Sequence, residues 1–266
     1  MKKETLKNIF DFLEEKENKK HKDNGSLKWK LFFNKSITKE ELNVNGDLNL
    51  RGLKIKSLPE GLKVRGNLDL KESEIQSLPE GLKVGGDLIL IDSKIKSLPE
   101  GLKVGGELDL YWSRELTSLP KTLKAEGDLN LGTCTSLTSL PKGFKVGGRL
   151  NLSHCENLTS LPEGLEVGGS LWLIESWGLK SLPKGLYVGG SLNLSDCVKI
   201  KELPDNLYVG GNLGIISTQI EDFPNNLFVR RDIGIRDTPL AEKYTDAEIR
   251  RNKNLNGGKF IGKIFR

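Results

Sequence analysis

His154 and Cys155 are adjacent residues whose side chains could act together as a base and a nucleophile. A thiol activated by a nearby imidazole is a common covalent catalyst. Side chains alternate between the two faces of an extended chain, so Cys155 is expected to point inward and His154 outward. The second histidine, His21, lies in a charged run. We therefore expect no catalytic site and no enzymatic activity.

The three cysteines occupy one position of a repeating pattern, because the step from Cys155 to Cys197 is twice the step from Cys134 to Cys155. The other occupants of this position are Ser73, Ser93, Ser113, Ser176, Thr218 and Thr238, with Leu53 in the first copy. Three cysteines are too few for a disulfide framework. We expect a small buried position with free thiols, and neither a metal site nor a cofactor. A disulfide between Cys134 and Cys155, about 5 Å apart on adjacent strands, is the minor alternative.

Gly-Gly pairs such as Gly85-Gly86 could be taken for a loop that binds phosphate. Such loops continue into Lys followed by Ser or Thr, and they open a helix. Here the pair precedes alternating apolar residues, which are typical of a strand. We therefore reject a phosphate-binding loop.

A repeat positions all of these residues, and nine regularly spaced prolines mark it. They are Pro59, Pro79, Pro99, Pro120, Pro141, Pro162, Pro183, Pro204 and Pro224. A nearly fixed period of about 20 residues is typical of a solenoid, in which each unit packs only against its neighbours. The chain of 266 residues is therefore expected to form one elongated, mainly β domain.

Each unit contains two apolar residues spaced two apart, which predict a strand with one inward face. The pairs begin at Leu48, Leu68, Leu88, Leu108, Leu129, Leu150, Leu171, Leu192, Leu213 and Ile233. After each pair come the small residue, then Ile or Leu, and then a Leu-Pro step that ends the extended run. We expect about ten units over residues 43–240.

The unit Leu68-x-Leu70-x-x-Ser73-x-Ile75, like Leu150-x-Leu152-x-x-Cys155-x-x-Leu158, resembles the core of leucine-rich repeats. The Leu-Pro-Glu-Gly-Leu segment is similar to the short Leu-Pro-rich repeats of bacterial and phage proteins. This resemblance implies an arc with parallel strands on the concave face and short turns or extended segments behind them. It also implies that the protein binds protein partners.

The sequence departs from that family in the residues before each apolar pair. Val lies four residues before the pair with Gly between them, as in Val64-x-Gly66-x-Leu68. The recurring glycines are Gly46, Gly66, Gly86, Gly106, Gly127, Gly148, Gly169, Gly190 and Gly211. Each could mark a bend with positive φ, or a place where two backbones approach too closely for a side chain. The sequence leaves both explanations open.

Residues 1–42 do not repeat and are expected to form an N-terminal cap made of a helix and a strand. The helix is predicted from the spacing of Leu6, Ile9, Phe10 and Leu13, and the strand from the alternation of Leu27, Trp29, Leu31 and Phe33. Thr38 and Glu41 have the spacing of a capping box on a short helical turn.

Residues 241–266 are expected to form a C-terminal cap. Thr245 and Glu248 have capping-box spacing at the start of a short helix, and the apolar and basic segment from Lys259 to Arg266 predicts a strand. Arg231 replaces the recurring glycine in the last unit, where we expect stacking to stop.

Residues that flank the apolar pairs are expected to face out of the concave sheet in three columns. The apolar members form two candidate partner-binding groups about 15 Å apart. The groups are Ile89, Ile91, Tyr111 and Trp112, and then Trp172 and Ile174. Exposed aromatic residues often anchor interfaces, whereas single apolar residues are also ordinary on surfaces.

Carboxylates also crowd onto neighbouring strands of this face. They are Asp69, Asp87, Glu107, Asp109 and Asp128, and the last four are added to the candidate partner-binding residues. They could steer a basic partner or form a solvated surface. No loop carries carboxylates at the spacing of a calcium site.

The net charge of +5 lies in the tail, where ten Lys or Arg and five Asp or Glu follow from Arg230 onward. The body is neutral, which makes nucleic acid an unfavoured partner. Weak contact of the basic tail with nucleic acid or an anionic membrane is a third alternative. A column of lysines on the turns, which begins with Lys63, Lys83 and Lys103, is expected to be neutralised by Glu60, Glu80 and Glu100.

No run of about 18 apolar residues could span a membrane, and no apolar signal segment follows Met1. We expect a cytoplasmic protein; the sequence leaves open secretion into a host by a route without such a signal. The expected function is that of a monomeric, non-catalytic module for protein-protein interaction. A structural component of a larger, virion-like assembly is the alternative.

Overall fold

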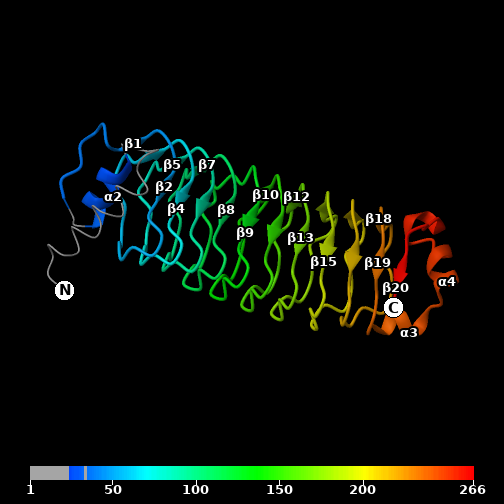
Figure 1. Cartoon of the computed structure of the whole chain (residues 1–266). Helices are drawn as coiled ribbons and strands as arrows, with labels where there is room; N and C mark the ends of the chain where they lie inside the picture. Colours follow the sequence, from blue (N-terminus) through cyan, green and yellow to red (C-terminus); the bar gives the residue numbers. More distant parts are fainter. Residues whose placement is uncertain (1–23, 33–34) are drawn as a thin grey trace.

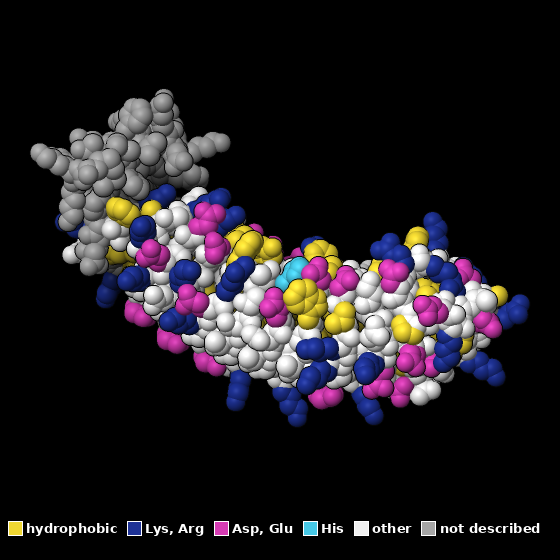
Figure 2. Space-filling model, turned by 90° about the horizontal axis from the view of Figure 1, so that it is seen from below, with side chains coloured by type: hydrophobic (Ala, Val, Ile, Leu, Met, Phe, Trp, Pro, Cys, Tyr) yellow, Lys and Arg dark blue, Asp and Glu magenta, His cyan; other side chains and the backbone are white. Residues whose placement is uncertain are grey.

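Short parallel strands stacked along one axis form the body of the protein in the computed structural model, which describes residues 24–32 and 35–266. Figure 1 shows the strands in chain order along an elongated body, with α2 (Asn24–Phe32) at one end and α3 (Pro239–Lys243) and α4 (Asp246–Arg251) at the other. The body is visibly curved in Figure 2. The prediction of a mainly β repeat solenoid is confirmed.

One parallel sheet runs through every unit, and we call it the continuous sheet. Its strands in order are β2 (Leu48–Asn49), β4 (Leu68–Asp69), β6 (Leu88–Ile89), β8 (Leu108–Asp109), β9 (Leu129–Asn130), β11 (Leu150–Asn151), β13 (Leu171–Trp172), β15 (Leu192–Asn193), β17 (Leu213–Gly214), β19 (Ile233–Gly234) and β20 (Ile264–Phe265). Equivalent residues pair, so Leu68 lies between Leu48 and Leu88. The ten predicted apolar pairs therefore each begin a strand, and the strand of each unit forms one rung.

A short strand precedes the strand of the continuous sheet in nine of the ten units, and these short strands form two separate sheets. The N-terminal short sheet contains β1 (Asn43–Val44), β3 (Lys63–Val64), β5 (Lys83–Val84) and β7 (Lys103–Val104). The C-terminal short sheet contains β10 (Lys145–Val146), β12 (Glu166–Val167), β14 (Tyr187–Val188), β16 (Tyr208–Val209) and β18 (Phe228–Val229). The Val of each short strand and the two Leu of the next strand point into one shared core, as alternation predicts.

The turn after each proline needs a residue with positive φ. Gly61 has φ +78° and Leu62 N donates to Pro59 O, which is the geometry of a turn that favours Gly at its third position. Gly or Asn occupies this position with positive φ in eight of the nine turns: Gly61, Gly81, Gly101, Gly143, Gly164, Gly185, Asn206 and Asn226. Thr122 is the exception, because a β-branched residue is strongly disfavoured in that conformation.

The short sheets are interrupted at this exception. Ala125 pairs with Val146 on one side, whereas β7 on the other side ends the N-terminal short sheet. Thr122 instead bonds to the preceding turn: its backbone N–H and its hydroxyl donate to the Glu100 carboxylate, and its Oγ1 accepts from Gly101 N. The altered turn therefore lies directly before the interruption between Val104 and Ala125.

We expect Thr122→Gly to join the two short sheets, because Gly restores the left-handed turn that the other units share. Hydrogen exchange should show the amides of Lys124 and Glu126 protected at least about tenfold more strongly than in the wild type. Thr122→Ala, which removes the same hydroxyl without favouring positive φ, is the matched control. Equal protection in the two variants would contradict this explanation.

The N-terminal strand prediction is wrong, because the segment Asn24–Phe32 is a helix, α2. Leu27 and Leu31 are four residues apart and therefore also fit one face of a helix. Leu27 is buried and Leu31 packs against the core. Lys30 pairs with Glu41 at 2.6 Å, and Thr38 and Glu41 form the two predicted capping bonds on a turn. The helix predicted around Leu6 to Leu13 lies outside the described residues.

The predicted capping box and C-terminal strand are confirmed, but stacking does not stop at Arg231. Thr245 and Glu248 form a capping box at the start of α4, and a 3₁₀ turn, η1 (Asn256–Gly258), follows. The chain then returns to the stack, where Ile233 N donates to Lys263 O at 2.9 Å and Ile235 N donates to Phe265 O at 2.8 Å. Gly262 takes the place of the recurring glycine, so β20 is an eleventh rung.

Candidate functional site

The small position predicted from the cysteines is buried throughout the stack, and the three thiols are free. Cys155 Sγ donates to Leu131 O in the preceding unit, and Ser176 Oγ makes the equivalent bond to Leu152 O. His154 faces outward with Nδ1 3.7 Å from the Glu175 carboxylate. Cys155 and His154 therefore do not form a nucleophile and base.

Burial raises the pKa of the Cys155 thiol to about 12, because the thiolate loses its hydration. The unfolded chain releases this proton near its ordinary pKa of about 8.5, so stability from this group is present below that pH and is lost as pH rises toward about 12. We expect the stability of the wild type relative to Cys155→Ser to fall by about 2 kcal/mol between about pH 8 and about pH 10. Urea unfolding at both pH values measures this difference, and a constant difference would contradict the prediction.

The recurring glycine marks close packing between backbones and not a positive φ. A Cβ at Gly86 would overlap Asn67 Oδ1 and lie 3.0 Å from the carbonyl carbon of Gly66. None of the recurring glycines belongs to the positive-φ glycines, which lie in the turns. This settles the two explanations that the sequence left open.

The side chains of the first outward column form a chain of hydrogen bonds from unit to unit, and they lie next to the recurring glycines. Asn67 Oδ1 accepts from Asp87 N, and Asp87 Oδ1 accepts from Glu107 N, both at 2.8 Å. Further acceptors in this chain are Asp47, Asp128, Ser170, Ser191, Asn212 and Asp232. The short polar residues of this column are therefore explained by structure.

The second outward column is also structural in most units. Asp69 Oδ1 accepts from Lys71 N and Asp109 Oδ1 accepts from Tyr111 N, two residues further along. Asn49, Asn130, Asn151 and Asn193 make the same turn. This local turn is a known preference of Asn and Asp. Four of the five predicted carboxylates, namely Asp69, Asp87, Asp109 and Asp128, therefore bond the backbone of the stack.

Four residues of these two columns do not follow the hydrogen-bond patterns, and their side chains are larger than those of the usual occupants. Glu107 and Arg149 replace the short acceptors of the first column, and Ile89 and Trp172 replace Asn or Asp in the second. Burial and the charges of Asp109, Asp128 and Asp87 raise the pKa of Glu107, and burial raises the pKa of Asp109. Neither backbone pattern explains these four side chains.

The first apolar group lies on β6 and β8. Ile89 pairs in register with Asp109, and Asp92 N, just after Ile91, donates to Tyr111 O. The Tyr111 and Trp112 rings meet edge to face with centroids 5.9 Å apart. Trp112 is 43% exposed, whereas the other three apolar residues of this group are half-buried.

Trp112 also adopts an unusual backbone conformation, with φ +64°. The same position has positive φ throughout the repeats, and its other occupants are mostly small or polar: Gly52, Glu72, Asp92, Thr133, His154, Glu175, Asp196, Ser217 and Asp237. A bulky aromatic residue in the left-handed region is strained. The Arg114 guanidinium lies 4.8 Å from the ring centroid of Trp112 and covers one face of it.

The second apolar group lies on β13, three rungs from Asp109. The Arg149 guanidinium stacks over Trp172 at 4.5 Å from its ring centroid and also lies 3.8 Å from Asp128. Trp172 and Ile174 are both half-buried. Arg149, which the sequence analysis did not select, therefore links the acidic and aromatic candidates.

Small residues separate the two groups and form a floor. Gly132 and Ser153 are buried, and they occupy the third outward column on the two intervening rungs. A Cβ at Gly132 would lie 3.0 Å from Tyr111 Cδ2, so the Tyr111 ring leans over this floor. The structure thus places one aromatic group on each side of a strip of small residues, and we call this surface the sheet face.

Several exposed apolar residues lie outside the two predicted groups. Trp177 is 45% exposed, and Val198 occupies the same position of the next unit. On the C-terminal short sheet the rings of Tyr187, Tyr208 and Phe228 are stacked with centroids 5.0 and 4.9 Å apart. Their recurrence at the same position of successive units was a usable signal. Figure 2 shows hydrophobic side chains in separate groups among charged ones.

No three His, Cys, Asp or Glu side chains within residues 24–32 and 35–266 are grouped as metal ligands. The same residues contain no helix that is long and apolar enough to cross a membrane. A scan of this chain against protein-family models finds no match, and a search of the curated proteins finds none either.

Proposed function

We propose that this protein is a non-catalytic binding module whose sheet face grips a protein partner. The observation that carries the proposal is the placement of the large side chains. Ile89, Trp172 and the strained Trp112 replace small or polar residues that the stack itself favours. Strain and lost backbone bonds persist in proteins where a function requires them. An interface would supply that requirement.

The chemistry of the two groups suits a protein interface. Trp, Tyr and Arg dominate the binding energy of such interfaces. Trp112 with Arg114, and Trp172 with Arg149, combine an aromatic ring and a guanidinium in each group. Glu107 adds a carboxylate beside them, which favours a partner with a basic residue between two apolar ones.

The resemblance to leucine-rich repeats supports this proposal. The rungs carry Leu-x-Leu on the strand, a small buried residue after it and Leu-Pro in the turn, as that family does. We infer that the protein is a leucine-rich repeat protein of the short Leu-Pro-rich type, which acts in the cytoplasm. In such proteins the strand face binds other proteins.

A matched pair of variants tests the proposed site. Ser153→Arg places a long side chain between the two groups, whereas Ser195→Arg makes the same change two rungs away. The two serines follow the same local turn, since their amides donate to Asn151 and Asn193 at 3.0 Å. Ser153 lies between the two apolar groups, whereas Ser195 lies on the far side of Ile174. We expect affinity capture from a lysate of the source cells to lose a protein with Ser153→Arg and with Trp112→Ala/Trp172→Ala, and to retain it with Ser195→Arg. Equal capture by all variants would contradict the proposal.

A structural role in a larger assembly is the second candidate, and the last rung favours it. Phe265 on β20 is 53% exposed and Ile261 is 92% exposed, at the open end of the continuous sheet. Light scattering over a range of concentrations tests this role, and a monomer at all of them would argue against it. The basic tail is a weaker candidate, because Arg250 bonds Gly262 O and Arg266 bonds Asp246 within the cap.

A further inference from the structure

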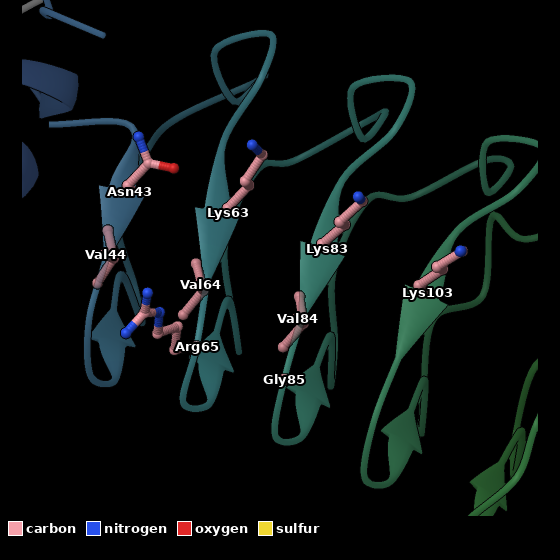
Figure 3. Close-up of a pocket in the computed structure, with 9 residues that line it drawn as sticks. All are labelled: Asn43, Val44, Lys63, Val64, Arg65, Lys83, Val84, Gly85 and Lys103. Atoms are coloured by element: carbon pink, nitrogen blue, oxygen red, sulfur yellow. The ribbon is translucent and has the colours of Figure 1, made fainter. Parts of the chain in front are cut away.

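The first residues of the short strands form a row of lysines on a surface other than the sheet face. Lys63, Lys83 and Lys103 pair in register, and Lys124 and Lys145 continue the row on the next two units. Figure 3 shows the first three lysine side chains at equivalent ends of successive strands. Adjacent parallel strands lie about 4.8 Å apart, so these like charges repel one another.

The carboxylates that were expected to neutralise this row do not do so. Within the described part of the chain, no ion pair involves Lys63, Lys83, Lys103 or Lys124. Glu100 accepts hydrogen bonds from Thr122, and Lys145 pairs with Glu166 at 2.9 Å. The prediction of local Glu-Lys pairs is therefore wrong, because residues three apart across a turn need not point toward each other.

A groove runs beside the lysines. Its first part has a volume of about 530 Å³, with Val44, Val64 and Val84 among its lining residues. Arg65 also lines this part. The same position is Gly85 and Gly105 in the next two units, so no side chain fills the groove there. Two further parts of about 630 and 400 Å³ follow. Lys103 lines both the first and the second part, and Lys124 and Glu126 line both the second and the third.

We propose that this lysine groove binds an acidic peptide segment in an extended conformation. Its carboxylates would lie on Lys63, Lys83 and Lys103 with Arg65 beside them, and its other side chains would face solvent. A row of point charges on flexible stems fits a linear chain of carboxylates. Same-side residues of an extended peptide are about 6.8 Å apart, so about six residues span the five lysines.

Other anions fit the groove less well. Compact phosphates are usually held by converging backbone N–H groups, but here these donors are used within the sheet. Lys63 N donates to Leu42 O, Arg65 N to Val44 O and Gly85 N to Val64 O, all in the preceding unit and at 2.8–2.9 Å. Bases of single-stranded nucleic acids stack on open aromatic faces. The one aromatic residue that lines these three parts, Phe144, is buried.

Fluorescence anisotropy with the whole chain tests this proposal. The probe is a labelled peptide of about twelve alternating Glu and Ser residues, and the Gln-Ser peptide is its uncharged counterpart. We expect Lys63→Gln/Lys83→Gln/Lys103→Gln to weaken binding of the Glu-Ser peptide at least about tenfold at low salt. Lys56→Gln/Lys180→Gln/Lys201→Gln removes the same charge from other exposed positions and should leave binding within about twofold.

Three results would overturn the proposal. They are equal weakening by the two triple variants, binding of the Gln-Ser peptide as tight as that of the Glu-Ser peptide, and tighter groove-dependent binding of single-stranded DNA or polyphosphate. Unchanged thermal unfolding of both triple variants shows that the fold is intact. Trp112→Ala/Trp172→Ala should bind the peptide normally, which separates this groove from the sheet face.

Discussion

Gly189→Ala should destabilise the protein by about 2–3 kcal/mol, since a side chain forced into close-packed structure displaces the backbone. A Cβ at Gly189 would overlap the carbonyl oxygen of Gly168 and lie 3.0 Å from its carbonyl carbon. That oxygen belongs to the neighbouring unit and cannot rotate away as a side chain could. Urea unfolding measures the change in the free energy of unfolding.

Gly185→Ala is the control, because it makes the same change four residues earlier. Gly185 has φ +65°, but nothing lies within 4 Å of an added Cβ. The expected cost is about 1 kcal/mol, which is the ordinary cost of a left-handed alanine. Equal costs at the two positions would mean that the units can move apart freely, contrary to the packing described above.

Phe260→Ala should cost about 3–5 kcal/mol, the usual range for a buried phenylalanine. Phe260 is buried in the core beneath the last rung, where it holds the segment that returns to β19. Because each unit packs mainly against its neighbours, the loss should stay local. Hydrogen exchange should show faster exchange at the amides of Ile233 and Ile235, with those of Leu88 and Leu90 unchanged.

Phe265→Ala provides the comparison for this variant. Phe265 lies on β20 but is exposed, so its replacement should change stability by no more than about 0.5 kcal/mol. The same exchange experiment should leave Ile233 and Ile235 protected. Faster exchange throughout the stack in Phe260→Ala would show that the units unfold together and not from the end.

The sequence predicted the repeat, its strands and its buried positions because these depend on spacing within one unit. Leu68 and Leu70 show the alternation of a strand, Cys155 occupies a position of small residues, and the prolines mark the repeat length. Each of these assignments depends only on residues close together in the sequence. The recurring glycine remained ambiguous, because its meaning depends on a carbonyl of the preceding unit. The segment around Leu27 is predicted wrongly as a strand, since the spacing of Leu27 and Leu31 fits both a strand and a helix.

The candidate site was predicted only in part. The aromatic groups around Trp112 and Trp172 are predicted because their positions in the repeat face outward from the sheet. Their role as a binding site remains a prediction. Four of the five carboxylates were selected for their charge, yet they hold backbone amides such as that of Glu107. Arg149 was missed because its meaning depends on Trp172, which belongs to the next unit and lies beside it only in the folded stack.

The interruption at Thr122 has a mechanical consequence. The continuous sheet passes through all eleven rungs, whereas the hydrogen bonding of the short sheets is broken between Val104 and Ala125. Hydrogen bonds between units resist bending of the stack. The stack should therefore bend most easily where one set of these bonds is missing. We expect the curvature of this protein to change most easily between its fourth and fifth rungs. Such flexing would alter the separation of Tyr111 from Trp172, so the two sides of the sheet face could adjust to the width of what lies between them.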